Sequence, residues 1–136
     1  MRPMRGDFFD TNVILYLLDD GPKADRAETC LAAGGTISVQ VLNETLVNCR
    51  RKAGMGWQEA AEFLAGIRSL CEVVDLTPDL HETGLALGAR YGFSVYDAMI
   101  VAAALTSGCE RLFSEDMQHG MRVEDGLRIL DPFRGL

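Results

Sequence analysis

The stretch DFFDTNVIL, residues 7–15, joins two short apolar segments through a polar step at Asp10. The aromatic run over residues 6–10 favours a buried strand, and the apolar spacing over residues 12–18 favours a helix. An Asp or Thr at the junction, Asp10 or Thr11, can accept hydrogen bonds from the first free N–H groups of that helix. The stretch therefore predicts a strand that leads directly into a helix, with a carboxylate between them.

Short strands and longer helices continue to alternate along the rest of the chain. Further helices are predicted at residues 21–35, 39–52, 57–70, 78–92 and 94–108. Further strands are predicted at residues 36–39, 71–76, 111–116 and 127–130. This alternation favours a mostly parallel sheet that helices cover on both faces. The predicted fold class is α/β, and the whole chain, residues 1–136, is predicted to form one domain.

The composition limits the classes of protein to which the chain can belong. Its 136 residues include 20 acidic and 13 basic side chains, for a net charge of −7, and 48% of them are hydrophobic. Such a hydrophobic fraction supports a folded core, and the negative charge argues against broad affinity for DNA or anionic membranes. The four widely spaced cysteines indicate free thiols, and the apolar runs are too short to span a bilayer. We therefore expect a cytoplasmic protein.

Four carboxylates from separate segments are candidate functional groups: Asp10, Glu44, Asp97 and Asp116. Asp97 is the most informative, because it is the only charged residue in the helix predicted at 94–108, and charges are rarely buried without a partner. Each of the four also has a structural explanation, as a helix cap, a favourable charge near a helix start, or a solvated acid. Carboxylates that converge repel one another, and this repulsion raises their pKa values or calls for cations such as Mg²⁺.

Four blocks of sequence, taken in order, resemble the PIN-domain ribonucleases, and in particular the VapC-type toxins of prokaryotic toxin–antitoxin pairs. The blocks are DTNVIL (10–15), SVQVLNE (38–44), VYDAMIVAAA (95–104) and LFSEDMQHG (112–120). The resemblance implies a three-layer α/β/α sandwich around a mostly parallel sheet of four to five strands. It also implies a cognate antitoxin as partner and a homodimer, whereas the composition alone predicts no association with a membrane.

The activity that the resemblance implies is metal-dependent cleavage of RNA. A PIN-domain ribonuclease hydrolyses phosphodiester bonds of single-stranded RNA with Mg²⁺ or Mn²⁺, and such ions can activate water and stabilise the leaving oxygen. The implied catalytic residues and metal ligands are Asp10, Glu44, Asp97 and Asp116, with Asn12 and Ser114 as supporting residues.

One block departs from the commonest form of the family, because SED is followed by MQHG and not by a more hydrophobic tail. The sequence leaves open whether Glu115 or Asp116 faces the metal, and we prefer Asp116.

Three other functions remain open at this stage. An acidic-pocket phosphatase usually carries an acid two residues after its first Asp, but that position is Asn12 here. A receiver-like domain needs a lysine at the end of a late strand, whereas Lys23 and Lys52 both lie in the first half of the chain. A catalytically silent PIN scaffold is the third alternative, and the presence of all four acids argues against it.

Overall fold

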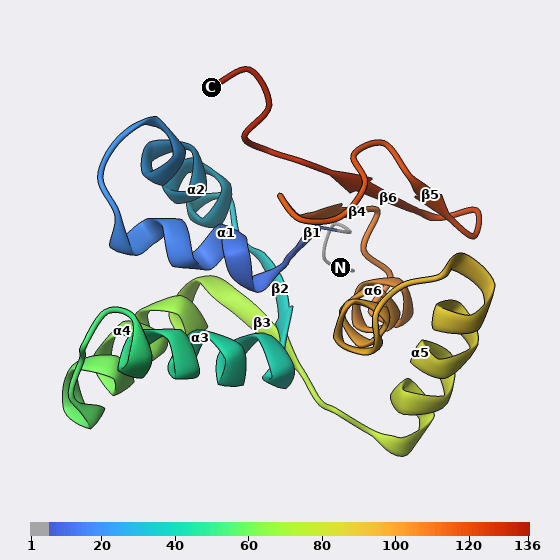
Figure 1. Ribbon diagram of the computed structural model, residues 1–136, viewed down its shortest axis with the longest axis horizontal. Helices are drawn as coiled ribbons and strands as arrows, with labels where there is room; N and C mark the ends of the chain where they lie inside the picture. Colours follow the sequence, from blue (N-terminus) through green and yellow to red (C-terminus); the bar gives the residue numbers. More distant parts are fainter. Residues whose placement is uncertain (1–5) are drawn as a thin grey trace, which may run out of the picture.

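The structure, a computed structural model, describes residues 6–136, which form a sheet with helices on both sides (Figure 1). The strands in this range are β1 (Asp7–Phe9), β2 (Gly35–Ser38), β3 (Cys71–Val74), β4 (Arg111–Phe113), β5 (Arg122–Val123) and β6 (Leu127–Leu130). They are arranged in the order β3-β2-β1-β4-β6-β5, and β5 is the strand that runs antiparallel to its neighbour.

Helices connect the strands from β1 to β4. They are α1 (Thr11–Leu15), its 3₁₀ extension η1 (Tyr16–Leu18), α2 (Pro22–Ala32), α3 (Val39–Arg51), α4 (Trp57–Leu70), α5 (Pro78–Tyr91) and α6 (Val95–Thr106). Of these, α1, α3, α5 and α6 begin at a side chain that caps them. The hydroxyls of Ser38, Thr77 and Ser94 each accept a hydrogen bond from an N–H three residues further on. The α/β prediction is confirmed, because strands and helices alternate through a mostly parallel sheet.

The sheet differs from the sequence prediction in two places. It has six strands within residues 6–136, against four to five expected, because the two-residue strand β5 is too short to show a periodic pattern. Gly35 was predicted to end a helix, but it is the first residue of β2. A Cβ at Gly35 would lie 2.5 Å from the Phe9 ring, so glycine at this position allows the ring to pack over β2.

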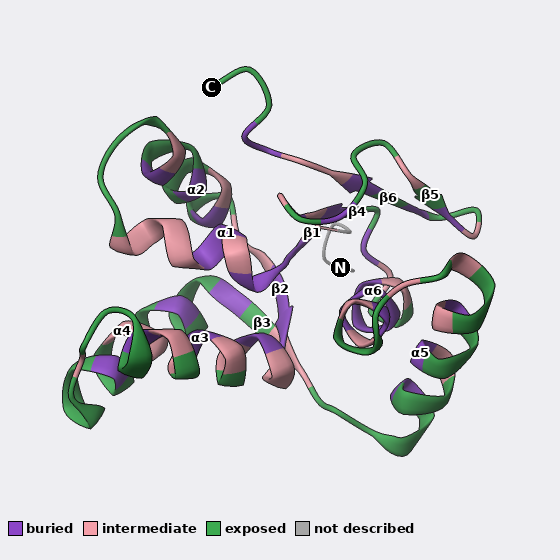
Figure 2. Cartoon of the chain, in the orientation of Figure 1, coloured by how far each residue is buried: buried purple, intermediate pink, exposed green. Residues whose placement is uncertain are grey.

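Helix α6 is the buried centre of one helical layer, as Figure 2 shows. Its residues Ala98, Ile100 and Val101 are almost fully buried. Helix α5 covers it closely, because a side chain at Gly84 would collide with the sulfur of Met99. The first turn of α6, which carries Asp97, is thereby fixed relative to the sheet. Within residues 6–136, no helix combines the length and the apolar character that a membrane span requires.

The parallel strands β1 and β4 end side by side at their carboxyl ends. Phe9 lies opposite Phe113 in the register, and the next backbone N–H, that of Asp10, donates to the Phe113 carbonyl at 2.9 Å. Side chains that follow these two strands therefore emerge at the same edge of the sheet, which is where sites in parallel α/β folds usually lie.

Candidate functional site

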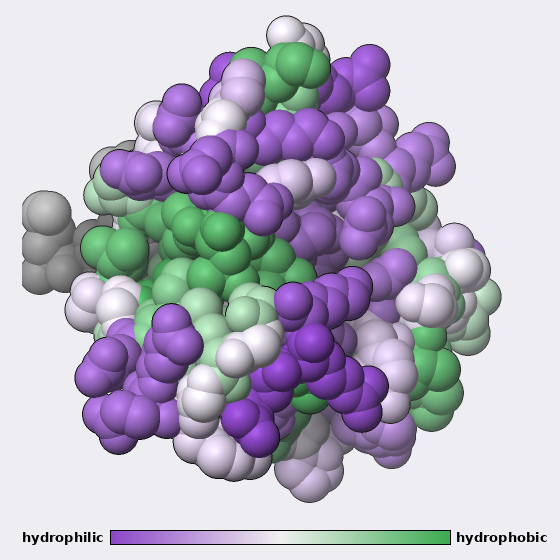
Figure 3. Space-filling model, turned by 60° about the vertical axis from the view of Figure 1, so that its left-hand side comes forward, coloured by the Kyte–Doolittle hydropathy of each residue, from purple (hydrophilic) through white to green (hydrophobic). Residues whose placement is uncertain are grey.

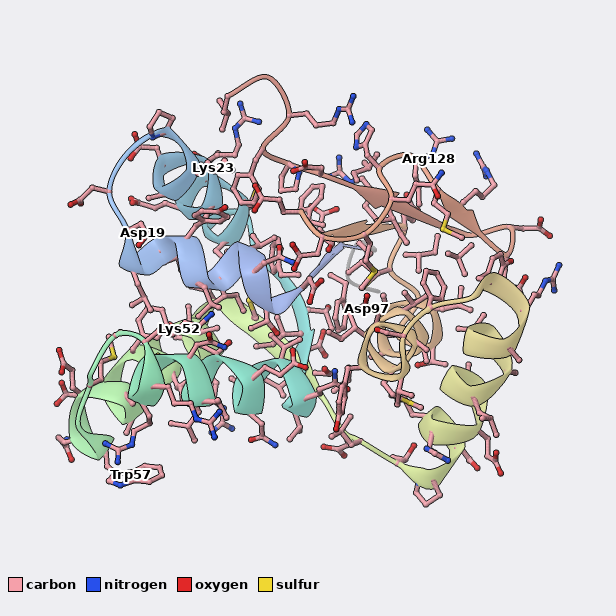
Figure 4. All side chains as sticks on the ribbon, viewed as in Figure 1. Asp19, Lys23, Lys52, Trp57, Asp97 and Arg128 are labelled. Carbon is pink, nitrogen blue, oxygen red and sulfur yellow. The ribbon has the colours of Figure 1, made fainter. Side chains whose placement is uncertain are left out.

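A pocket of about 260 Å³ opens at this edge. It is lined by Asp10, Thr11, Asn12, Leu15, Glu44, Asn48, Asp97, Ile100 and Asp116. The structure thus brings together the four acids singled out in the sequence, which come from the end of β1, from α3, from the first turn of α6 and from the bend after β4. Figure 4 shows Asp97, in the first turn of α6, on the side of that helix toward α1. Because one water occupies about 30 Å³, the pocket has room for a cation with several waters.

Asp10 is buried at the floor of the pocket and caps α1. Its Oδ1 accepts a hydrogen bond from the Thr11 N–H at 2.7 Å, and its Oδ2 accepts one from the Ser114 hydroxyl at 2.8 Å. Burial is the main cause that raises the pKa of Asp10 to about 6, and the nearby carboxylates of Asp97 and Glu44 raise it further against these hydrogen bonds. The Asp10 carboxylate is therefore a charge held in a site that does not solvate it well.

Asn12 ties α1 to the bend after β4. Its Nδ2 donates to Asp10 Oδ2 and Asp116 Oδ2, both at 3.1 Å, and more weakly to the Ser114 hydroxyl at 3.4 Å. Its Oδ1 accepts from the Glu115 N–H at 3.0 Å. The Asn12 amide therefore lies between two of the pocket acids and bonds to both of them.

Ser114, predicted as a supporting residue, is fully buried beneath Asp116. Besides donating to Asp10, its hydroxyl oxygen accepts from the N–H groups of Asp116 at 3.2 Å and Met117 at 3.3 Å. The side chain thus orients one carboxylate and holds the backbone that carries another.

Glu44 is oriented by two residues that the sequence did not predict as part of the site. The Thr11 hydroxyl donates to Glu44 Oε1 at 2.5 Å, and Gln40 Nε2 donates to Oε2 at 3.1 Å. Gln40 also donates to the carbonyl of Tyr96, next to Asp97, at 3.1 Å. One pattern could have identified Gln40, because it lies four residues before Glu44 and thus on the same face of α3.

Asp97 lies opposite these groups, at the start of α6. Burial raises the pKa of Asp97, and the carboxylates of Asp116 and Glu44 add to the effect. The pocket thus combines partial burial with mutual repulsion.

Glu115 and Asp116 face opposite ways. Asp116 lines the pocket, whereas the Glu115 carboxylate turns outward to Lys23 Nζ and the Tyr16 hydroxyl, each at 2.6 Å. The hydrogen bond from Lys23 is the main cause that lowers the pKa of Glu115. The structure therefore places Asp116 in the pocket and Glu115 outside it.

The pocket acids have no basic counterion in the described part of the chain. The ion pairs found in residues 6–136 are Lys23–Glu115, Arg90–Glu124 and Arg111–Asp7. As placed, the His, Cys, Asp and Glu side chains of these residues form no group of three or more that is tight enough to hold a metal ion. The chemistry of the donors nevertheless fits a hard divalent cation, because they are carboxylate oxygens whose charges are otherwise not neutralised.

Comparisons with known proteins relate the chain to one family. The model of the PIN domain family matches residues 8–120, and no curated protein sequence matches the chain. Among solved structures, it is similar to a toxin–antitoxin complex from Klebsiella pneumoniae, with 21% identity over 94% of this chain and 98% of that chain and a TM-score of 0.74. It is also similar to VapC20 of Mycobacterium tuberculosis, a toxin that cleaves the sarcin–ricin loop, with 25% identity, 82% and 90% of the chains covered, and a TM-score of 0.66.

A third similar structure is a DNA-bound VapBC complex from Salmonella typhimurium, with 21% identity, 95% and 99% of the chains covered, and a TM-score of 0.70. The family model spans the strand–helix units that build the acidic pocket, from β1 to the bend after β4. The chain therefore belongs to the PIN domain family.

Proposed function

We propose that this chain is an endoribonuclease, dependent on Mg²⁺ or Mn²⁺, that hydrolyses phosphodiester bonds of single-stranded RNA. The observation that carries the proposal is the convergence of four carboxylates in one pocket, with no basic partner among residues 6–136. Membership of the PIN domain family and the likeness to a toxin that cleaves the sarcin–ricin loop support an RNA substrate. A phosphatase or receiver-like activity has no comparable support.

The residues that would hold the cation are Asp10, Glu44, Asp97 and Asp116. A bound divalent ion supplies positive charge that stabilises the phosphate oxygens and makes water easier to deprotonate. The chain itself orients the acids: Ser114 and Thr11 fix Asp10 through hydrogen bonds, and Gln40 fixes Glu44. The amide nitrogen of Asn12 donates one hydrogen bond to the Asp10 carboxylate and another to the Asp116 carboxylate. These two bonds keep both carboxylates close together at the pocket.

We also propose that the chain is the toxin of a toxin–antitoxin pair, which binds a cognate antitoxin and forms a homodimer. Two of the similar structures reported above are toxin–antitoxin complexes, which supports an antitoxin as partner. Figure 3 shows an apolar patch bordered by hydrophilic side chains on the surface, and such patches often mark protein interfaces. Independently of this patch, Val95 and Tyr96, which precede the pocket residue Asp97 in the chain, are 67% and 69% exposed.

The nuclease proposal is tested by cleavage of single-stranded RNA with Mn²⁺, with and without EDTA. We expect cleavage by the wild type, loss of cleavage with EDTA, and loss in Asp10→Asn. Asp79→Asn, which changes an exposed acid in α5, is the matched control and retains activity. Cleavage that is indifferent to both EDTA and Asp10→Asn would remove the proposal.

The partner proposals are tested separately. Co-expression with the product of the neighbouring reading frame should suppress the cleavage, and light scattering should give the mass of a dimer. A monomeric mass at micromolar concentration would contradict the homodimer.

A further inference from the structure

Glu115 is held by two residues that lie outside the acidic pocket. Its Oε2 accepts from Lys23 Nζ of α2 and its Oε1 from the Tyr16 hydroxyl of η1, each at 2.6 Å, and Lys23 Nζ also approaches the Tyr16 hydroxyl at 3.3 Å. We call these three residues the Glu115 clamp. Figure 4 shows Lys23 on α2, well apart from Asp97 at the start of α6.

The clamp rests on packed aromatic side chains. The Tyr16 ring meets the Phe133 ring edge to face, with centroids 4.7 Å apart. Lys23 Nζ lies 5.2 Å from the centroid of Tyr16 and 5.9 Å from that of Phe133, within the range of cation–π attraction. Phe133 is itself buried, so the clamp is anchored to the core.

The clamp acts on the segment that carries Asp116. Residues 114–117 form a bend with no helix or strand to hold it. On one side, the Glu115 N–H donates to Asn12 Oδ1 at 3.0 Å, and on the other the Glu115 carboxylate is held by the clamp. Within residues 6–136, the Asp116 carboxylate receives one hydrogen bond, from Asn12 Nδ2. Its position therefore depends on how the backbone of the bend is held.

We propose that the Glu115 clamp is a positioning device that sets Asp116 for a divalent cation, and that Lys23 and Tyr16 are positioning residues of the site. The inference rests on the proposed function, because it takes Asp116 as a cation ligand. A partly exposed ion pair contributes little to stability, and Lys23 is 42% exposed. Residues that orient metal ligands, in contrast, commonly affect metal affinity on the order of 10- to 100-fold.

Two variants separate positioning from simple electrostatics. Lys23→Met removes a positive charge from the neighbourhood of an acidic pocket, so Coulomb's law alone predicts tighter binding of Mn²⁺. Loss of the clamp predicts the opposite, a dissociation constant about tenfold higher. Tyr16→Phe removes one hydrogen-bond donor with no change of charge, and it should also weaken Mn²⁺ binding.

The experiment measures the Mn²⁺ dissociation constant by the electron paramagnetic resonance of free Mn²⁺, without RNA. Lys23→Arg should bind Mn²⁺ more tightly than Lys23→Met, because it keeps a charged donor at the clamp. Asp7→Asn is the matched control, since it breaks the ion pair with Arg111 at the other end of β1 and β4, and it should leave the constant unchanged. Melting curves in EDTA verify that every variant is folded.

The possible outcomes are distinct. If wild type binds Mn²⁺ but Tyr16→Phe and Lys23→Met bind within twofold of it, the clamp does not position Asp116 and only this inference fails. Tighter binding by Lys23→Met also overturns it in favour of electrostatics. If wild type neither binds Mn²⁺ nor cleaves RNA, the proposed function fails and the inference fails with it.

Discussion

The two ends of the β1–β4 pair carry carboxylates in opposite situations. At the amino end, Asp7 accepts two hydrogen bonds from the guanidinium of Arg111, at 2.6 and 3.0 Å. At the carboxyl end, Asp10 is buried and receives hydrogen bonds from neutral donors, and no basic side chain in residues 6–136 pairs with it.

The two ends differ in whether a basic side chain of the chain itself neutralises the carboxylate. The register places Asp7 directly opposite Arg111, so the chain neutralises this carboxylate with its own cation. At the other end, four acids line one pocket, and in our proposal a bound cation neutralises their charge. The same two strands thus have one end that is complete by itself and one end that, in our proposal, requires a divalent ion.

The largest difference in activity is expected when one acid is removed at each end of the strand pair. Asp97→Asn should lower kcat for RNA cleavage about 1000-fold, because a lost cation site removes several kcal/mol of transition-state stabilisation. Asp7→Asn should change kcat less than about twofold, because Asp7 pairs with Arg111 at the opposite end of these strands and does not line the pocket. Steady-state cleavage of a fluorescent RNA measures both, and equal losses would show that the two ends do not differ in function.

Without metal, wild type and Asp10→Asn should also differ in how the free energy of unfolding depends on pH. The pKa of Asp10 is about 6 in the folded chain against the ordinary value of 3.8 for an aspartate, so the native state binds this proton more tightly than the unfolded state. The stabilising effect of the proton is complete below about pH 4 and is lost as the pH rises through about 6.

Relative to Asp10→Asn, wild type should therefore lose roughly 2–3 kcal/mol between pH 4 and pH 7 in EDTA. Urea denaturation at a series of pH values measures the difference. A constant difference across this range would show that Asp10 is not a destabilised charge.

A divalent cation should stabilise the pocket end and leave the other end unaffected. At about 100 times the dissociation constant, Mn²⁺ should raise the free energy of unfolding by about 2.7 kcal/mol at pH 8. At pH 5 the gain should be smaller, because protons compete for Asp10 and Asp97, whose pKa values are both raised. Thermal melts test this, and an unchanged shift in Asp97→Asn would contradict it.

The smallest effect is expected at the amino end itself. The side chains of Arg111 and Asp7 are 53% and 15% exposed, so solvent screens this pair mainly on the side of the arginine. Asp7→Asn should lower the free energy of unfolding by at most about 1 kcal/mol, and by less in 1 M NaCl. A larger loss in urea denaturation would mean that this pair holds the sheet together.

Much of the fold could be predicted because it depends on local patterns. The predicted helix at 57–70 and the predicted strand at 127–130 coincide with α4 and β6. Gly35 was predicted at the end of a helix but belongs to β2. The Phe9 ring packs over this glycine, and such a contact between two strands leaves no mark in the local sequence pattern. The pairing that creates β5 is likewise a contact with β6 and not a property of its two residues.

Local sequence patterns are enough to identify which acids follow strands and which lie on buried or capped helices, because periodicity and capping act over a few neighbouring residues. The packing of distant elements is what places Asp116 in the pocket and turns Glu115 away from it. The partners that turn Glu115 outward, Lys23 and Tyr16, lie 92 and 99 positions away along the chain. Adjacent acids are equivalent in a local pattern, and they become different only when distant elements pack beside them.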